Sequence, residues 1–431
     1  MVSYDRYKYT PTKYQMAGVN YCIQRHYVIL ADEQGLGKSF EALVAGYSTN
    51  KRILLVVPAY LKANWERELH KVFKKVPPYK VFTKAKDVKD FTLTNEEIII
   101  SSYSQIDHLK EYFEWADCII ADEAHYLKGM ETKRTLQFVN YITNFPPRNL
   151  MLLTGTPVEN YIPELYPLLY LCSLNPLKDN GLDIDKYIVH FFEFCEKFCY
   201  SRRTRRGVKY SGKKNLHLLE KLLFGKYIRR LTADVIKLPC MNHQDVMVGF
   251  KDNKKLEKAF KSFEESGLES AVKRDSAIAK AGLTVKFVND TLLNRPCIIF
   301  TDHPDAVDLI VEGLNQKQEY GTVIAEGISG KVSTTRRELI TSNFISGRTP
   351  ILVATIGTAS TGYNFTHVNT MVFNDTSWKP KSNSQAIKRI HRIGQELDCI
   401  YYYILEGNID RLIKNSNKQK EKAIDALIRV A

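Results

Sequence analysis

The sequence predicts an α/β protein with two lobes, each built on a parallel β-sheet, and a mainly helical insertion between them. Short, continuous apolar runs separated by segments of helical periodicity are typical of strands buried on both faces of a parallel sheet. In the first part of the chain these runs are Val28–Leu30, Ile53–Val57, Ile98–Ile100, Cys118–Ile120 and Leu150–Leu153. The last third repeats the scheme with Cys297–Phe300, Thr322–Ala325, Ile351–Ala354 and Thr370–Phe373. This repetition predicts two similar units with a cleft between them.

The pattern between the two sets of strands is different. From about Pro163 to Asp290 the strand signal fades, and leucines, aromatic residues and lysines at helical spacing dominate. We therefore expect a first lobe over 1–162, a helical insertion and connection over 163–290, and a second lobe over 291–431. Residues 409–431 have the pattern of a charged amphipathic helix that closes the second lobe.

Composition narrows the class of protein. The 431 residues suggest two or three domains, and 44% hydrophobic with 26% charged residues is ordinary for a globular protein. The formal net charge of +14 favours a polyanionic partner, above all nucleic acid. No apolar run approaches the roughly 18 residues of a membrane span, and the N-terminus lacks an apolar signal core. We therefore expect no membrane partner.

The eight cysteines contain no Cys-x-x-Cys pair, which favours a reducing compartment. We expect a cytoplasmic protein of bacterial or phage type, or a nuclear one if the source is eukaryotic. Cys195 and Cys199 stand four positions apart in an aromatic segment after His190. A zinc site there is one interpretation, and two buried thiols is the favoured one.

A basic run, Arg202–Lys209, is followed by Lys213 and Lys214. It is either a solvated loop or a contact to the phosphate backbone of a nucleic acid, which needs no fixed geometry.

The segment Gly35-Leu36-Gly37-Lys38-Ser39 follows a predicted strand and should open a helix. Glycines let backbone N–H groups approach phosphate oxygens, and a helix N-terminus favours negative charge. Lys38 would pair with the β- and γ-phosphates of ATP, and Ser39 would offer its hydroxyl to Mg²⁺. The full phosphate-loop pattern begins with a glycine, and Asp32 stands there instead.

Asp122 and Glu123 end the strand before them, and His125 follows. An isolated Asp-Glu pair is usually a surface pair, but the strand context and Lys38 favour catalysis. We assign Asp122 to Mg²⁺ and Glu123 to the attacking water. Thr154 and Thr156 flank a glycine at another strand end, and we expect them to sense Mg²⁺ or His125 and to shift when phosphate leaves.

Within Gln385–Gln395, Arg389 and Arg392 stand three positions apart. On a helix this spacing places both guanidinium groups on one face, where they could clamp a phosphoryl group in its transition state. The alternative is an ordinary basic helix. Because these arginines lie in the second lobe, they would complete the site across the cleft, so that ATP closes the cleft and hydrolysis opens it.

The order and the residues of these segments resemble those of the superfamily-two helicase-like ATPases, and specifically the Swi/Snf-type DNA translocases. The resemblance covers most of the chain outside the helical middle, and the ending His391-Arg-Ile-Gly-Gln395 is its most specific element. The other matching segments are Tyr14–Val19 (Q motif), Val57–Glu66 (motif Ia), Ile100–Tyr103 (Ib), Asp122–His125 (DEAH box), Tyr227–Pro239 (the junction after the first lobe), Ile298–Thr301 (IV), Ala354–Gly362 (V) and Ser377–Pro380.

This resemblance implies two RecA-like lobes and a DNA-dependent ATPase that uses ATP and Mg²⁺. It also implies that Gln15, Gly362 and Gln385 contribute to ATP binding. The positions carried over as DNA contacts are Pro58, Ser102, Thr301 and Thr358.

Motif V departs from the usual pattern because it lacks a Gly-Gly pair, and it looks more like the annealing-helicase branch that remodels stalled forks. No chromatin-reading module flanks the motor, so nucleosome sliding is not expected. We expect a double-stranded DNA translocase that remodels branched DNA by branch migration or fork regression, in replication, recombination or repair. The alternatives are a strand-separating DNA or RNA helicase and an ATP-gated DNA-binding clamp that displaces bound proteins.

Overall fold

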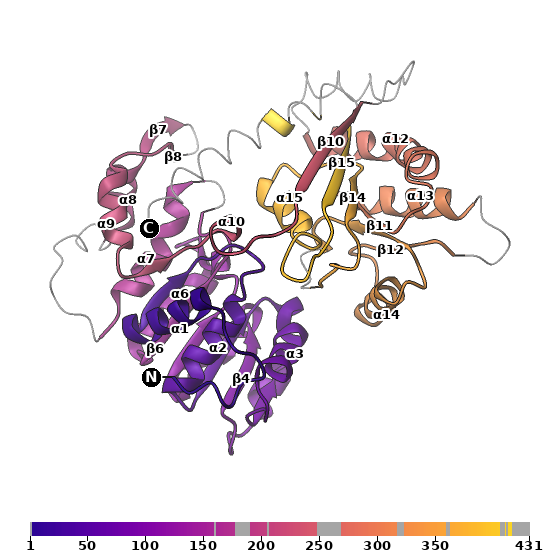
Figure 1. The fold of residues 1–431 in the computed structure, drawn as a ribbon. Helices are drawn as coiled ribbons and strands as arrows, with labels where there is room; N and C mark the ends of the chain where they lie inside the picture. The colour runs from indigo at the N-terminus through magenta and orange to yellow at the C-terminus, as the bar shows by residue number, and fades with distance from the viewer. Residues whose placement is uncertain are drawn as a thin grey trace. The chain divides into compact units, whose positions relative to one another are not determined.

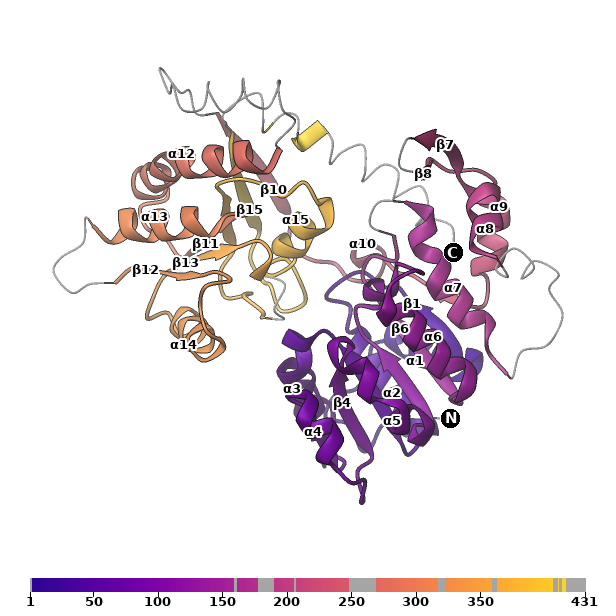
Figure 2. The same ribbon diagram turned by 180° about the vertical axis from the view of Figure 1, so that it is seen from behind.

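The protein is described here by a computed structural model. The structure describes residues 2–158, 161–176, 190–204, 207–247, 269–316, 323–358, 363–405, 410 and 413–415. The chain divides into two compact units, and the division falls between Ile236 and Lys237. Each unit contains one parallel β-sheet covered by helices, as Figures 1 and 2 show from opposite sides.

The sheet of the first unit has seven parallel strands in the order β3-β4-β2-β5-β6-β1-β9. All five strands predicted for this part of the chain are present, and their residues are completely buried. The sequence pattern did not predict the edge strands β3 and β9. The strands are β1 (Tyr27–Leu30), β2 (Ile53–Val57), β3 (Tyr79–Val81), β4 (Ile98–Ser102), β5 (Cys118–Ala121), β6 (Asn149–Leu153) and β9 (Tyr227–Ile228).

Alternate residues of these strands enter two separate cores, because successive side chains point to opposite faces of a sheet. Val28 and Leu55 pack with residues of α1, α2 and α3, whereas Ile29 and Leu54 pack with residues of α5, α6 and α7. Burial on both faces explains why the strands are continuous apolar runs. The helices are α1 (Lys13–Arg25), α2 (Lys38–Thr49), α3 (Lys62–Val72), α4 (Ala85–Asp90), α5 (Lys110–Trp115), α6 (Lys133–Asn144) and α7 (Tyr166–Ser173).

The segment predicted as a helical insertion, 163–290, contains strands as well as helices. Its first part extends the first unit: Phe194 and Leu219 join the same core as α5–α7, and β9 pairs with β1. Its second part contributes an edge strand and a long helix to the second unit. The elements are α8 (Phe191–Phe198), the antiparallel pair β7 (Tyr200–Thr204) and β8 (Gly207–Ser211), α9 (Leu216–Leu223), α10 (Thr232–Val235), β10 (Met241–Met247) and α12 (Glu269–Asp290).

The sheet of the second unit has six parallel strands in the order β10-β15-β14-β11-β13-β12. One face packs on α14 and α15 and the other on α12 and α13. Three predicted strands are confirmed: β11 (Cys297–Thr301), β13 (Ile351–Thr355) and β14 (Thr370–Phe373). The remaining elements are β12 (Ala325–Ile328), β15 (Cys399–Leu405), α13 (Pro304–Asn315), α14 (Thr334–Ile345) and α15 (Pro380–Ile387).

The fourth predicted strand of this unit, Thr322–Ala325, was wrong in position, because β12 begins only at Ala325. The side-chain oxygen of Asn315 accepts hydrogen bonds from the backbone N–H groups of Ile324 and Ala325, at 3.0 and 3.2 Å. Pairing with β13 then starts at Ala325. As an edge strand, β12 tolerates Glu326 and Gly327, so its sequence carries no continuous apolar signal.

Of the predicted C-terminal helix, 409–431, the described residues are Asp410 and 413–415, and the rest lies outside the described part of the chain.

Candidate ATP site and its surroundings

The predicted catalytic groups of the first unit gather at the carboxyl edge of its sheet. The loop with Lys38 follows β1, Asp122 follows β5, and Thr154 follows β6. Because β5, β6 and β1 are adjacent parallel strands, their carboxyl ends lie side by side. This edge is where open α/β sheets bind their ligands.

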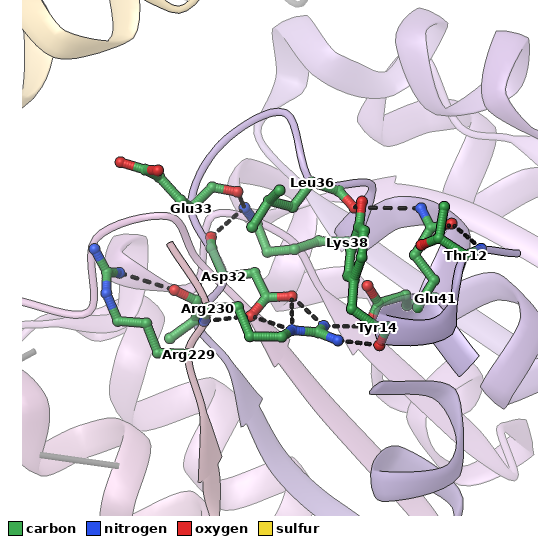
Figure 3. A network of polar contacts seen from close by, with 11 residues as sticks. Thr12, Tyr14, Asp32, Glu33, Leu36, Lys38, Glu41, Arg229 and Arg230 are labelled. Atoms are coloured by element: carbon green, nitrogen blue, oxygen red, sulfur yellow. Dashed lines mark hydrogen bonds and ion pairs between the residues drawn. The ribbon is translucent and has the colours of Figure 1, made fainter. Parts of the chain in front are cut away.

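The phosphate loop takes a shape that depends on glycine. Gly35 and Gly37 have φ angles of 92° and 87°, in the left-handed region that favours glycine. A Cβ atom on Gly37 would lie 2.6 Å from Nε2 of Gln15. The backbone carbonyl of Leu36 accepts hydrogen bonds from the hydroxyl of Tyr14, at 3.0 Å, and from Nε2 of Gln15, at 3.3 Å. These contacts place Gln15 directly against the phosphate loop. Figure 3 shows Tyr14 beside Leu36.

Lys38 is the first residue of α2, and its ammonium group turns back over the loop. Nζ donates to the backbone carbonyls of Asp32, at 2.6 Å, and Glu33, at 3.2 Å. Desolvation lowers the pKa of Lys38, while the charges of Glu123, Asp32 and Asp122 oppose that shift. These carboxylates favour a charged ammonium at the helix N-terminus, where ATP phosphates would bind.

Asp122 is held from two sides. Its Oδ2 accepts a hydrogen bond from Nε1 of Trp65, at 2.8 Å, and its Oδ1 accepts one from the backbone N–H of Glu123, also at 2.8 Å. Desolvation and the charge of Glu123 raise the pKa of Asp122 to about 7, although the hydrogen bonds and Lys38 lower it. The carboxylate is therefore oriented and sensitive to its neighbours.

Glu123 has a φ of 48°, a left-handed conformation that is rare for a side chain of this kind. Such strain is concentrated at functional sites, where the surrounding structure maintains it. Its Oε2 lies 3.1 Å from Nδ1 of His125. The structure thus brings together three of the predicted residues, Asp122, Glu123 and His125, in one short turn.

The residue types fit Mg²⁺. Carboxylate and hydroxyl oxygens, here those of Asp122 and Ser39, suit this cation, which usually takes one or two carboxylates and completes its shell with phosphates and water. Consistent with that mode, no group of three or more His, Cys, Asp or Glu side chains in the described residues could hold a metal by itself.

Thr154 and Thr156 belong to a loop that contacts the phosphate loop. The backbone N–H of Thr156 donates to the hydroxyl of Thr154 at 3.1 Å, and Thr154 N–H donates to the Leu30 carbonyl at 3.1 Å. Gly155 lies against Gln34, because a Cβ there would be 2.9 Å from Cγ of Gln34. A displacement of one loop would therefore displace the other.

Sequence reasoning missed a buried ionic cluster beneath the phosphate loop. Arg230 lies between the carboxylates of Asp32 and Glu41 (Figure 3). Its backbone N–H and Nε donate to Oδ1 of Asp32 at 2.8 and 3.0 Å, and its Nη2 donates to Glu41 at 2.6 Å. Desolvation raises the pKa of Glu41 to about 8, although Arg230 opposes the shift.

The neighbouring Arg229 donates from Nη1 to the backbone carbonyls of Ala31, at 2.8 Å, and Gly155, at 3.1 Å. The two arginines therefore join the loops after β1 and β6 to the segment after β9. The signal available in the sequence was the Arg229-Arg230 pair within the junction motif.

Three of the four predicted DNA-contact side chains donate hydrogen bonds within the protein. Ser102 is fully buried, and its hydroxyl donates to Oε1 of Gln105 at 2.8 Å. Thr301 is fully buried and donates to Asp375, and Thr358 donates to the Thr355 carbonyl at 2.9 Å. Pro58 is buried at the start of the turn Ala59–Leu61. Direct contacts of these four residues with DNA remain predictions.

The helical placement of Arg389 and Arg392 was wrong. The helix α15 ends at Ile387, and residues 388–394 form turns and bends. The carbonyl of Arg389 instead accepts a hydrogen bond from the backbone N–H of Phe365, at 2.9 Å. Arg389 is 8% exposed, and its Nη1 donates to the Tyr363 carbonyl at 3.2 Å. Gln385 lies in α15.

Some of the remaining predicted residues lie within the described part of the chain, and others do not. Gly362, Arg205 and Arg206 lie outside the described residues, whereas Arg202 and Arg203 are exposed on β7. Cys195 and Cys199 are buried free thiols, and burial raises the pKa of Cys195 to about 12 and that of Cys199 to about 11. No helix in the described part of the chain is long and apolar enough to cross a membrane.

Comparison with known proteins assigns the chain to a family. Residues 14–297 match the family described as SNF2-related domain, and residues 275–394 match the helicase conserved C-terminal domain. Together the matches define a helicase-type ATPase motor. The chain belongs to the SNF2-related family, and the resemblance to Swi/Snf-type ATPases is confirmed.

Two relatives illustrate the similarity. SWI/SNF-related matrix-associated actin-dependent regulator of chromatin subfamily A-like protein 1 of Xenopus laevis is 27% identical over 437 residues, which cover 95% of this chain and 43% of that protein. The human DNA annealing helicase and endonuclease ZRANB3 is 25% identical over 450 residues, covering 95% and 39% of the two chains. This chain therefore spans less than half the length of either relative.

A solved structure, described as the Sulfolobus solfataricus SWI2/SNF2 ATPase core in complex with dsDNA, is 20% identical to this chain. The alignment covers 99% of this chain and 98% of that one, with a TM-score of 0.48.

Proposed function

We propose that this chain is a DNA-dependent ATPase that translocates along double-stranded DNA and remodels branched DNA by branch migration or fork regression. The observation that carries the proposal is the meeting of Lys38, Asp122 and Glu123 at the carboxyl edge of one sheet, in a chain of the SNF2-related family. The similarity to a protein named as a DNA annealing helicase supports the branched-DNA role.

The chemistry follows from the residue types. Lys38 and the N–H groups of the phosphate loop bind and orient the phosphates of ATP. Asp122 and Ser39 hold Mg²⁺, which neutralises charge on the phosphates when it is bound. Glu123 orients the attacking water and accepts its proton, and Gln15 fixes the loop from the side of α1. Arg389 and Arg392 stabilise the charge that develops on the transferred phosphoryl group.

The +14 net charge and the exposed Arg202 and Arg203 support a phosphate-dominated DNA contact. Ser104, two positions after the buried Ser102, is exposed, and we propose that the loop after β4 presents it to the DNA.

The test compares steady-state ATP turnover with duplex, single-stranded, forked and four-way DNA, and with RNA. We expect strong stimulation by duplex and branched DNA and weak stimulation by single strands or RNA. The enzyme should also displace a triplex-forming third strand and move a four-way junction while leaving long blunt duplexes paired. Efficient unwinding of long duplexes would favour a strand-separating helicase instead. An absence of DNA-stimulated turnover would favour the ATP-gated clamp.

A further inference from the structure

Two residues that follow neighbouring strands, β2 and β4, each make a hydrogen bond to Asp122. Trp65, on α3, donates from its indole Nε1 to Oδ2 at 2.8 Å. Tyr103, the first residue after β4, donates from its hydroxyl to the backbone carbonyl of Asp122 at 2.8 Å. Both side chains are almost fully buried, at 1% and 2% exposure. Asp122 is thus fixed by one bond to its carboxylate and another to its main chain.

These two residues directly adjoin the segments that are expected to contact DNA. Trp65 is in the helix that follows β2 and the Pro58 turn, and Tyr103 directly follows Ser102. In the sheet, β2 lies between β4 and β5, so β4 does not pair with the strand that carries Asp122. Tyr103 therefore reaches past the end of β2 to make its bond. The loops that precede Trp65 and follow β4 expose Tyr60 and Ser104, respectively.

Tyr103 also contacts a neighbour of the turn that contains Glu123 and His125. Its ring stacks on that of Tyr126, with centroids 5.6 Å apart and planes 7° apart. The guanidinium of Arg134 lies over both rings, 5.9 Å from the centroid of Tyr103 and 5.4 Å from that of Tyr126. Because Tyr126 follows His125, a displacement of the loop after β4 reaches the turn that contains Glu123.

The bond from Trp65 fixes the orientation of the Asp122 carboxylate. Its Oδ2 accepts from the indole N–H and its Oδ1 from the backbone N–H of Glu123, each at 2.8 Å. Without the bond to Trp65, the carboxylate that is expected to hold Mg²⁺ would be fixed from one side only.

We propose that Trp65 and Tyr103 are positioning residues that couple the two DNA-facing loops to Asp122, so that DNA on these loops aligns the carboxylate and accelerates ATP hydrolysis. This inference rests on the proposed function, because it explains how DNA would stimulate turnover. It differs from simple structural support, in which both bonds would stabilise the fold equally with and without DNA.

The first test is Tyr103→Phe, which keeps the stacked ring and removes only the hydroxyl. DNA-stimulated turnover should fall about fivefold, the effect of losing one ordinary hydrogen bond. Turnover without DNA should fall by a smaller factor, and the DNA concentration that gives half-maximal stimulation should stay close to wild type. Tyr112→Phe is the matched control, because this buried hydroxyl donates to the Val88 carbonyl at 2.9 Å, away from Asp122. It should leave the stimulation unchanged.

The second test is Trp65→Phe. Losing the N–H should raise the Mg²⁺ concentration required for half-maximal DNA-stimulated turnover, because the carboxylate is no longer held at Oδ2. Leu69→Val, at a fully buried position of the same helix, creates a cavity without touching Asp122. This control should lower the melting temperature without changing the Mg²⁺ requirement.

The outcomes separate this inference from the proposed function. If duplex DNA stimulates the wild type and Tyr103→Phe equally, the coupling is rejected and the ATPase motor stands. A loss of equal size with and without DNA would also reject it, in favour of structural support. If DNA does not stimulate the wild type, the proposed function fails and the coupling fails with it.

Discussion

Glu123 combines an uncommon backbone with a defined side-chain contact. Its φ of 48° places it at the start of the turn after β5, and its carboxylate lies 3.1 Å from His125. The strain of a left-handed non-glycine residue costs about 1–3 kcal/mol, and it persists only where the surroundings enforce it. The neighbouring bonds from Trp65 and Tyr103 to Asp122 supply such an environment.

Two substitutions of single residues in the candidate ATP site should have different effects. Glu123→Gln should retain ATP binding and reduce turnover by at least about 10²-fold, because the general base is lost. Lys38→Ala should weaken ATP binding as well as turnover, because the phosphates lose their ammonium partner. Nucleotide-binding titrations and steady-state ATPase rates separate the two. Normal turnover by Glu123→Gln would show that the water has another base.

The cluster around Arg230 gives a prediction about stability. Arg230→Met should lower the free energy of unfolding by about 3 kcal/mol, because it leaves Asp32 and Glu41 buried without their partner. Arg52→Met breaks an exposed pair with Asp117 and should cost under about 1 kcal/mol.

The loss of stability caused by Arg230→Met should depend on pH. The folded pKa of Glu41 is raised to about 8, above its unfolded value, so the folded state holds this proton more tightly. That contribution is complete below the unfolded pKa and is lost as pH rises through the folded pKa. Removing Arg230 raises the folded pKa further, so the loss should be larger near about pH 8.5 than near about pH 5.5. Denaturant titrations at both values measure it, and an equal loss would contradict this assignment.

Among the secondary-structure elements, the β7–β8 hairpin stands out. Its two strands are antiparallel, whereas the two larger sheets are parallel, and its first strand exposes Arg202 and Arg203. Its base is ordered by Tyr200, whose ring lies 5.2 Å from the Lys214 ammonium and close against Gly212. The ordered base gives the basic strand a fixed position on the first unit.

If this hairpin contacts phosphates, replacing Arg202 and Arg203 by Gln should weaken duplex binding independently of sequence. The slope of log affinity against log salt should become shallower by about 0.9 for each phosphate that the variant no longer neutralises. Replacing Lys86 and Lys89 by Gln, two exposed charges of α4, removes the same charge elsewhere on the first unit. Equal slopes for both double variants would exclude the hairpin from the DNA interface.

The whole molecule contains two parallel-sheet units joined near Ile236, and its formal net charge is +14. The family match spans the first unit and the start of the second, and the helicase C-terminal match covers much of the second. The residues that we propose as catalytic groups of the second unit are Arg389 and Arg392.

We predict that Arg389→Ala or Arg392→Ala retains ATP binding and lowers DNA-stimulated turnover by about 10³-fold or more. Since Arg389 is 8% exposed, Arg389→Lys is the companion variant: it keeps the charge and loses the planar fork. Arg348→Ala, an exposed arginine of the same unit, serves as the control and should behave as wild type. Turnover by Arg389→Ala at the wild-type rate would remove that residue from the site.

The sequence by itself determined the strand sets, the parallel sheets and the residues of the phosphate loop and Asp-Glu turn. Apolar runs such as Ile53–Val57 indicate burial on both faces of a sheet. The segment Gly35–Ser39 places glycine, lysine and serine next to one another along the chain. Such signals depend on neighbours along the chain. They fail where groups from other parts of the chain take part. Asn315 binds the backbone where β12 begins, and the backbone of Arg389, beyond the end of α15, bonds to Phe365.

Only the tertiary structure decided what surrounds the catalytic groups. Arg230 is 198 positions from Asp32, and Trp65 is 57 positions from Asp122, yet each pair is hydrogen-bonded. No local pattern specifies such partners, because parallel sheet order brings together strand ends that are far apart in sequence. The chain thus encodes the catalytic residues locally, whereas long-range packing determines their orientation and charge.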